Sequence, residues 1–375
     1  MESLQVHVTA ERNERDRANR GNPHAAPVTV GCRCDEAVAD GQYLRAMLRM
    51  PAEWSPHERT LMGWPSRAEI WGDHLEEAED EYVAVAQAIA AHEPLTMLAR
   101  PADAERASSR LGANVEVVEM PLDDSWLRDT GPVYVTGHGR RAGVDFTFNA
   151  WGHKFEPYAD DAAIASRWLA RTSEPRIDAD LVCEGGAIAT DGEGTVLTTE
   201  SCLLNPNRNA SMTRAEIERR LAGALGASRV IWVPYAIDDR DTDGHIDLVA
   251  AFCAPGLVVV QGGDDPAWPG TNRLAMVRRC IEGALDASSR ALRVIELPVL
   301  PTVEVDGTVY AVPYLNYYVC NGAVIVPVTG NPADPDMLAI LADAYPGREV
   351  VPVPGRILAA GGGGPHCITQ QVPMP

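Results

Sequence analysis

The sequence predicts an α/β fold, and three observations support this prediction. Apolar strand-like runs alternate with helical patterns from the middle of the chain onward, as they do in α/β domains. The 375 residues, 46% of them hydrophobic, can bury a large core. No linker rich in Gly, Ser or Pro interrupts the body of the chain. We therefore expect one domain over residues 46–375, after a charged and poorly ordered N-terminal extension over residues 1–45.

The individual elements follow from hydrophobic spacing and from residues that start or stop helices. Residues 73–92 begin with acidic side chains and continue with an apolar face at helical spacing, which predicts a helix. Thr213 and Gly226 are typical of a helix N-cap and a helix stop, and they bound a helix over residues 212–226. We expect further helices over residues 158–171, 273–287 and 335–345. Strands are expected over residues 114–120, 195–199, 228–234, 247–253, 257–262, 293–298 and 348–353, and within 309–330.

Composition narrows the classes of function. The formal net charge is -21, from 53 acidic and 32 basic residues, which argues against a nucleic-acid partner. An acidic surface attracts small cationic molecules, although it also simply aids solubility. No apolar run approaches the roughly 18 residues of a membrane span, and the N-terminal segment does not resemble a secretory signal. We therefore expect a cytoplasmic protein whose eight cysteines are free thiols.

Polar residues gather at the ends of predicted strands, where burying them is costly unless function or pairing holds them. These clusters span residues 123–135, 183–209, 238–252 and 314–330. His245 and Asp247 are two residues apart, so in an extended segment they face the same side. They suit an acid/base pair or two metal ligands, and a capped turn is the structural alternative. Asp129 precedes a Thr-Gly-Pro turn and is either a functional carboxylate or part of that turn.

The C-terminal stretch GGGGPHC adds a cysteine behind four glycines. Glycines allow the backbone to approach a ligand closely, and their N–H groups can stabilise a thiolate at Cys367, which His366 or His245 would help to ionise. A thiolate, a histidine and carboxylates are what attack on a cationic carbon requires. A zinc site of His245, Asp247 and Cys367 is the rival interpretation. It is less favoured because structural zinc spacings and an HExxH motif are absent.

These clusters resemble the agmatine deiminase family of the guanidine-modifying pentein superfamily, which is related to the bacterial peptidylarginine deiminases. The resemblance covers nearly the whole chain after the extension. It rests on the segments MPAEWSPHERTLMGWPSR, DDSWLRDTGP, FNAWG, EGG, TTESCLLNPNRN, DTDGHID, YLNYYVCNGAVIVP and GGGGPHCITQQVP. Family members more usually read GGGNIHC at the tail, where this chain has Gly364-Pro365 before His366, and His153 replaces a glycine after NAWG.

The resemblance implies a five-bladed pentein α/β propeller, built from pseudo-fivefold ββαβ modules as a single catalytic domain. It also implies a role for each matched residue. Cys367 would be the nucleophile and His245 the general acid/base, while Asp129 and Asp247 grip the guanidinium group. Glu184 and Trp126 would line the substrate site. For the far end of the substrate, Asp123 and Asp124 are candidates to hold an ammonium group, or else are solvated loop acids.

The reaction implied is hydrolysis of agmatine to N-carbamoylputrescine and ammonia through a covalent thiouronium on the cysteine, a step of putrescine biosynthesis. No metal or organic cofactor is expected, and the partner is a small cationic guanidino compound. Alternatives are a peptidylarginine deiminase and an amidinohydrolase or amidinotransferase that acts on another guanidino compound. A homodimer is compatible with the sequence.

Overall fold

The structure is a computed structural model that describes residues 48–235, 237, 241–263 and 270–375. The described residues all belong to one compact unit, bounded by Gln42 and Pro375. The predicted extension over residues 1–45 lies outside them. None of the helices in the described part of the chain combines the length and the apolarity that a membrane span requires.

Five of the six sheets share one strand pattern, in which a middle strand pairs antiparallel with one neighbour and parallel with the other. Three of these sheets are β4-β5-β6 (Val133–Gly137, Arg140–Thr147, Arg176–Val182), β7-β8-β9 (Ile188–Thr190, Thr195–Thr199, Arg229–Val233) and β10-β11-β12 (Ala250–Ala254, Leu257–Gln261, Arg293–Leu297). The other two are β15-β16-β17 (Tyr318–Cys320, Ala323–Val328, Glu349–Pro354) and β18-β1-β2-β3 (Thr369–Pro373, His57–Gly63, Leu95–Ala99, Glu116–Glu119). The sixth sheet is the hairpin β13-β14 (Thr302–Val305, Thr308–Ala311).

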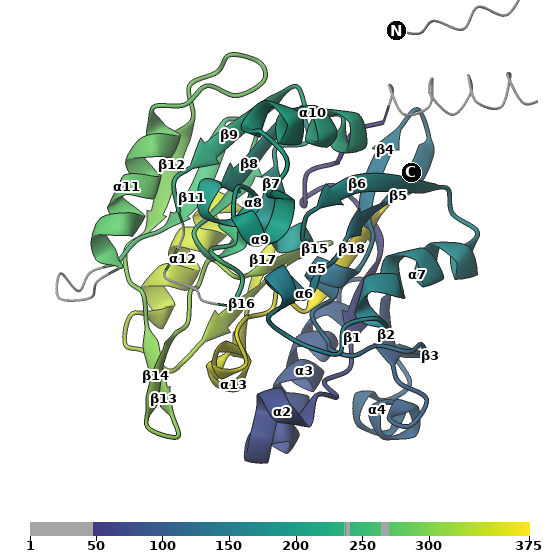
Figure 1. Cartoon of the computed structure of the whole chain (residues 1–375). Helices are drawn as coiled ribbons and strands as arrows, with labels where there is room; N and C mark the ends of the chain where they lie inside the picture. Colours follow the sequence, from purple (N-terminus) through teal and green to yellow (C-terminus); the bar gives the residue numbers. More distant parts are fainter. Residues whose placement is uncertain (1–47, 236, 238–240, 264–269) are drawn as a thin grey trace, which may run out of the picture. The chain divides into compact units, whose positions relative to one another are not determined.

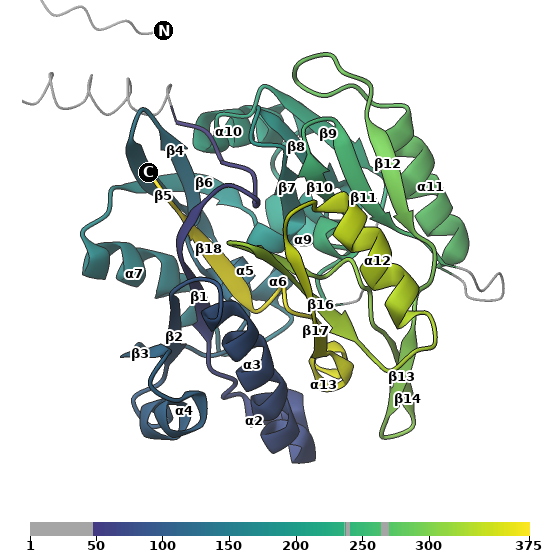
Figure 2. The same ribbon diagram turned by 180° about the vertical axis from the view of Figure 1, so that it is seen from behind.

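In each of the five sheets a helix connects the two parallel strands, as a parallel connection requires. These helices are α3 (Leu75–Ala90), α7 (Ile164–Thr172), α10 (Arg214–Leu225), α11 (Thr271–Glu282) and α12 (Asp334–Ala344), and they lie on the outside of the sheets in Figures 1 and 2. The shorter helices are α2 (Ala68–Trp71), α4 (Ala104–Leu111), α5 (Leu127–Thr130), α6 (Ala150–His153), α8 (Glu200–Leu203), α9 (Pro206–Asn209) and α13 (Arg356–Ala360). Single 3-10 turns are η1 (Gly72–His74), η2 (Asp161–Ala163), η3 (Gly185–Ala187) and η4 (Ile246–Leu248). The described chain is therefore a mixed α/β fold made of repeated ββαβ modules.

Most predicted elements are present within a few residues of their expected bounds. The helix predicted over residues 212–226 is α10, which has a complete capping box between Thr213 and Glu216 and ends at Gly226 in a left-handed conformation. The strand predicted over residues 247–253 starts too early. Residues 246–248 form η4 instead, closed by the bond from the N–H of Val249 to the carbonyl of Ile246, and β10 begins at Ala250.

The last strand of the chain joins the first sheet. Strand β18 pairs antiparallel with β1, and β1 pairs parallel with β2, so the two ends of the described chain share one sheet. In Figure 1 β18 (yellow) lies beside β1 (purple). Val372 on β18 is 1% exposed and packs in a cluster with Leu61 and Leu98. The C-terminal segment is therefore a structural part of the core.

Replacing Val372 with aspartate tests this closure. We expect Val372→Asp to lower the free energy of unfolding by roughly 3 kcal/mol or more, because it places an unpaired carboxylate in an apolar cluster. The control is Met374→Asp on the same segment, whose side chain is 52% exposed and which should change stability by less than about 0.5 kcal/mol. Urea unfolding followed by circular dichroism measures both. Equal stability of the two variants would show that β18 does not close the sheet.

Candidate active site

The polar residues of the site occupy the same position in each of the five modules. Asp129 precedes β4, Glu184 precedes β7, His245 precedes β10, Asn316 precedes β15 and Cys367 precedes β18, in each case just before the first strand of its module. All five side chains are buried, at 0–8% exposure. The repeated topology therefore brings together residues that lie up to 238 positions apart in the sequence.

The glycines before Cys367 make room for its neighbours. A Cβ atom on Gly363 would lie 2.6 Å from the ring of Trp126 and 3.1 Å from the sulfur of Cys367. A Cβ atom on Gly364 would lie 2.7 Å from Oδ1 of Asn316. Bulk is therefore excluded on both sides of the thiol. The glycine run reflects this close packing.

Pro365, the departure two residues before Cys367, costs the loop no hydrogen bond to Asn316. The backbone of Asn316 accepts from the N–H of His366 at 3.1 Å, and its side-chain Oδ1 accepts from the N–H of Cys367 at 3.4 Å. Pro365 lacks an N–H, but its carbonyl still accepts from the hydroxyl of Thr369 at 2.8 Å.

The thiol of Cys367 faces a carboxylate and an amide. Its Sγ lies 3.4 Å from Oδ2 of Asp247 and 3.2 Å from Nδ2 of Asn316. Burial, followed by the negative charges of Asp247 and Asp129, raises the pKa of this thiol well above its ordinary value. The raised pKa favours the protonated form of the thiol.

A chain of buried charges holds Asp247 from behind. Nδ1 of His366 lies 2.9 Å from Oδ2 of Asp247, and Nε2 of His366 lies 2.8 Å from Oε1 of Glu53. Burial opposes ionisation of Asp247, but the hydrogen bond and charge of His366 outweigh it and lower the pKa of the carboxyl group. Burial also opposes ionisation of Glu53, but the charges of His366 and Arg128 outweigh it and lower the pKa of Glu53 to about 2. His366 therefore stabilises the carboxylate and does not contact the thiol as a base.

Asp129 is held by two donors from distant segments. Its Oδ2 accepts from Nε1 of Trp151 at 2.9 Å, and its Oδ1 accepts from the N–H of Gly186 at 2.9 Å. The turn interpretation of Asp129 is therefore replaced by contacts across the site. Burial raises its pKa; His245 only partly offsets this, and Asp247 adds to it.

The imidazole ring of His245 lies between the carboxylates of Asp129 and Glu184. Its Nδ1 lies 3.8 Å from Oδ2 of Asp129, and its Nε2 lies 3.9 Å from Oε2 of Glu184. A Cβ atom on Gly186 would lie 2.6 Å from Nδ1 of His245, 2.9 Å from Oδ1 of Asp129 and 2.9 Å from Oδ2 of Asp247. Glycine at this position therefore leaves open the space that Nδ1 of His245 and the two carboxylates surround.

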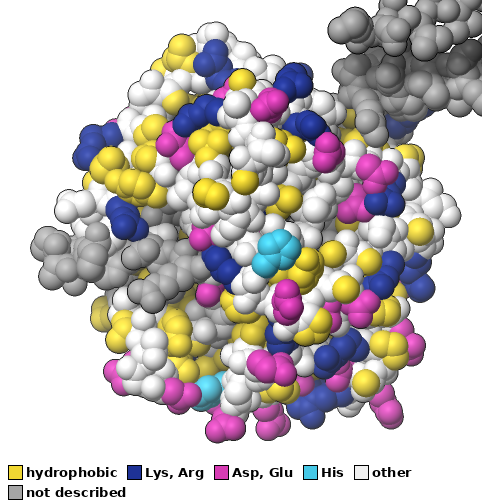
Figure 3. Space-filling view, in the orientation of Figure 1, with side chains coloured by type: hydrophobic (Ala, Val, Ile, Leu, Met, Phe, Trp, Pro, Cys, Tyr) yellow, Lys and Arg dark blue, Asp and Glu magenta, His cyan; other side chains and the backbone are white. Residues whose placement is uncertain are grey.

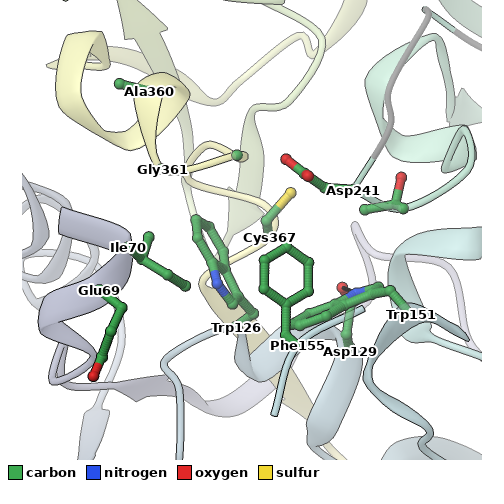
Figure 4. Close-up of a pocket in the computed structure, with 12 residues that line it drawn as sticks. Glu69, Ile70, Trp126, Asp129, Trp151, Phe155, Asp241, Ala360, Gly361 and Cys367 are labelled. Carbon is green, nitrogen blue, oxygen red and sulfur yellow. Dashed lines mark hydrogen bonds between the residues drawn. The ribbon is translucent and has the colours of Figure 1, made fainter. Parts of the chain in front are cut away.

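A cavity of about 220 Å³ has Asp129, one of these carboxylates, in its wall (Figure 4). Three aromatic side chains contribute to its wall: Trp126, Trp151 and Phe155. Asp129 and Cys367 line it, with Asp241 on the opposite side from Trp126. None of the described residues that line it is a lysine or an arginine. On the face shown in Figure 3, basic side chains are interspersed with acidic ones.

Asp123 and Asp124, the candidates for an ammonium group, do not line this cavity. Oδ2 of Asp123 accepts from the N–H of Asp160 at 2.8 Å. Asp124 is fully buried, and its Oδ2 lies 3.8 Å from Nη1 of Arg67. Burial raises the pKa of its carboxyl group to about 6. Asp124 is therefore not a solvated loop acid. One oxygen of each carboxylate accepts from a backbone N–H, that of Asp160 for Asp123 and that of Ser125 for Asp124. A contact between either residue and a ligand stays a prediction.

The remaining predicted residues come together around the thiol. Asp129, Trp126 and Cys367 line the cavity, and Asp247, His245 and Glu184 follow in the contact network behind them. The rival zinc set of His245, Asp247 and Cys367 does not form a ligand group among the described residues. The sequence reasoning missed Asn316, Trp151, Gly186 and Glu53. Asn316 had a detectable signal, since it is an amide inside an apolar run at a strand end.

Comparisons with known proteins agree on the relatives of this chain. Residues 49–373 match the family of Porphyromonas-type peptidyl-arginine deiminases. An agmatine deiminase of Pseudomonas aeruginosa is 41% identical over 354 residues, which cover 87% of this chain and 96% of the relative. A solved agmatine deiminase of Enterococcus faecalis has a TM-score of 0.84 and 32% identity, and covers 87% of this chain and 96% of its own. A C. jejuni agmatine deiminase variant with substrate bound has a TM-score of 0.80 and 27% identity, with 88% and 97% covered.

Removing one negative charge beside the thiol should ease its ionisation. We expect Asp247→Asn to shift the pH profile of Cys367 alkylation by iodoacetamide to lower pH, because the carboxylate at 3.4 Å raises the thiol pKa. Alkylation at Cys367 is quantified by peptide mass spectrometry. The matched control is Asp145→Asn, which removes a buried carboxylate paired with Arg176 and should leave the profile unchanged. An unchanged or higher midpoint in Asp247→Asn would contradict this electrostatic interpretation.

Proposed function

Because the chain belongs to the Porphyromonas-type peptidyl-arginine deiminase family, we propose that it is an agmatine deiminase. It hydrolyses agmatine to N-carbamoylputrescine and ammonia through a covalent thiouronium on Cys367. One observation carries the proposal. A buried thiol lies 3.4 Å from Oδ2 of Asp247 and lines, together with Asp129, a cavity whose described lining has aromatic and acidic residues but no basic ones.

The guanidinium group binds between Asp129 and Asp247. Oδ1 of Asp247 is buried and has no hydrogen-bond partner in the described structure, so it is available to a guanidinium N–H. Paired carboxylate contacts fix the plane of the guanidinium group as well as its charge. The rings of Trp126 and Trp151 line the way in, and aromatic faces stabilise cations.

Binding of the cation activates the nucleophile. The carboxylates that raise the pKa of Cys367 are the same ones that the guanidinium neutralises, so its arrival favours the thiolate and the thiol proton leaves to solvent. The amide of Asn316, 3.2 Å from the sulfur, can donate to the anion. The sulfur then forms a bond to the central guanidinium carbon, which becomes tetrahedral.

His245 moves the protons of both half-reactions. It donates a proton to an NH₂ group of the tetrahedral adduct, the C–N bond breaks, and ammonia leaves the thiouronium behind. It next accepts a proton from water as the water oxygen bonds to the same carbon. The C–S bond then breaks as the hydroxyl proton of this second adduct passes to solvent, which releases the neutral ureido product and the thiolate. Nδ1 is the nitrogen placed for these transfers, because it faces the space above Gly186.

The charge of the cavity wall selects the terminal group at the far end of the substrate. Asp241 lines the cavity on the side opposite Trp126 and suits the terminal ammonium of agmatine (Figure 4). A free arginine would bring a carboxylate, for which the described lining offers no basic partner. We therefore favour agmatine over arginine. A peptide-linked arginine has neither terminal charge and is the alternative that the test below separates.

The finer architecture is part of the proposal. Five modules of one topology, each with a site residue at the same position, support a five-bladed propeller around a pseudo-fivefold axis. The cytoplasmic setting, the homodimer and the absence of a nucleic-acid partner stay predictions from the sequence.

Ammonia release from a panel of guanidines tests the substrate. We expect agmatine to be used with the highest kcat/KM, ahead of arginine and of a peptide whose arginine is blocked at both ends. Cys367→Ala should form no ureido product while it keeps the circular dichroism spectrum of the parent. Release confined to the blocked peptide would replace agmatine by peptidylarginine, and full activity of Cys367→Ala would remove the nucleophile.

A single methyl group on Gly186 should block the site without harming the fold. We expect Gly186→Ala to lower kcat/KM by about 10²-fold or more, because its Cβ enters the space of the guanidinium and displaces the groups around it. The control is Gly223→Ala in α10, where a Cβ meets no atom within 4 Å. Both variants should unfold near the parent midpoint. Parent-like kinetics of Gly186→Ala would show that the substrate lies elsewhere.

A further inference from the structure

A second group of chemically reactive side chains lies behind the site. Ligand atoms of Glu184, Cys202 and His245 all lie within 4.8 Å of one another, and the three residues are 0%, 0% and 1% exposed. Cys202 has no part in the mechanism above. Carboxylate, thiolate and imidazole are ligands that zinc accepts.

Two of these ligand atoms have no hydrogen-bond partner in the described structure. They are Oε2 of Glu184 and Nε2 of His245, which lie 3.9 Å apart. The carboxylate of Glu184 is held in this orientation because its Oε1 accepts from Nε of Arg208 at 2.6 Å. Buried polar atoms without partners are uncommon and costly, so both of these atoms have capacity for a ligand.

The loops that carry the group are tied to each other. The hydroxyl of Thr199 accepts from the N–H of Cys202 at 3.2 Å and donates to the carbonyl of Gly244 at 2.6 Å. The N–H of His245 donates to the hydroxyl of Thr242 at 3.1 Å. The three ligand atoms are therefore positioned by a shared backbone framework, which favours binding over rearrangement.

The surrounding charge favours a cation. Arg208 contacts Glu184, but Asp243 lies 2.9 Å from Arg208 and is shared with Lys154 at 2.8 Å. Asp129 lies on the other side of His245, 3.8 Å away. Asp247 adds a further carboxylate to this region, and this carboxylate is paired with His366. Acidic groups thus flank the group on two sides, and Arg208 carries a fixed positive charge on the side of Glu184.

We propose that Glu184, Cys202 and His245 form an inhibitory binding site for a thiophilic divalent cation such as Zn²⁺. Binding breaks the S–H bond of Cys202, its proton passes to solvent, and the sulfur, Oε2 of Glu184 and Nε2 of His245 bond to the ion. The site differs from one on the nucleophile, because Cys367 is not a member of the group.

The bound ion inhibits by fixing the tautomer of His245. A metal on Nε2 requires the lone pair of that nitrogen, so the ring proton must sit on Nδ1, where Asp129 is 3.8 Å away. Nδ1 is the nitrogen that faces the substrate space. It then cannot accept the proton of water, and turnover stops while the guanidinium site stays open. This consequence rests on the proposed function, whereas the binding itself does not.

Direct binding is measured with Co²⁺, whose visible absorption reports tetrahedral thiolate coordination. When Co²⁺ is added to the metal-free enzyme, this absorption should appear. Zn²⁺ added afterwards should abolish it, because it displaces the Co²⁺. Cys202→Ser should lose it, with affinity at least about tenfold weaker. Cys183→Ser is the matched control, since Cys183 is also buried and adjoins Glu184 but is outside the ligand group. Cys367→Ala should keep the signal. Retention in Cys202→Ser with loss in Cys367→Ala would overturn the proposal.

Kinetics supply the second measurement. Cys202 is not part of the catalytic machinery, so Cys202→Ser and Cys202→Ala should turn over agmatine like the parent, and both should resist Zn²⁺. Zn²⁺ should lower kcat in the parent and in Cys183→Ser without raising KM, because the substrate space stays free. Undiminished zinc sensitivity of the Cys202 variants, or inhibition that agmatine relieves, would place the ion on Cys367 and refute the site. If no guanidine is turned over, the cobalt measurement still decides the binding.

Discussion

Uncompensated negative charge around one thiol is the constraint on which the site depends. Buried carboxylates are costly unless they are paired. Asp247 is paired from behind by His366, and Glu184 by Arg208, whereas Asp129 receives only neutral donors. No Lys or Arg is among the described residues that line the cavity beside Cys367. The carboxylates therefore raise the pKa of the thiol and favour a cationic ligand, and we propose that a bound guanidinium group lowers this pKa again.

The fold supplies this arrangement by repetition. Each ββαβ module contributes at least one polar residue from the segment before its first strand, and the module of β10 contributes two, His245 and Asp247. Closure is necessary because Cys367, which we propose as the nucleophile, belongs to the segment that carries β18. Pairing of β18 with β1 fixes the position of Cys367, and the glycines before it leave space for Trp126 and Asn316.

Local signals explain which parts were predictable from the sequence. Thr213 and Gly226 bound α10 as expected, because capping depends on neighbouring residues. Cys367, His245 and Asp129 were identified because polar residues at strand ends are unusual, and through their match to family motifs. Long-range partners were not predictable by pattern. The sequence makes Asp123 a candidate for the ligand, but it does not reveal that one oxygen of its carboxylate accepts from the N–H of Asp160, 37 residues away. Asn316 reaches the thiol only once the modules assemble.

The most direct test of the account is the ionisation of Cys367 with and without a bound cation. Thiolate absorbance is titrated against pH in the parent, and the titration of Cys367→Ala is subtracted to isolate this residue. The measurement is repeated with a saturating unreactive amidinium analogue of agmatine. We expect the pKa of the Cys367 thiol to lie above its ordinary value in the free enzyme and to fall clearly when the cation is bound. The same midpoint in both states would contradict this expectation.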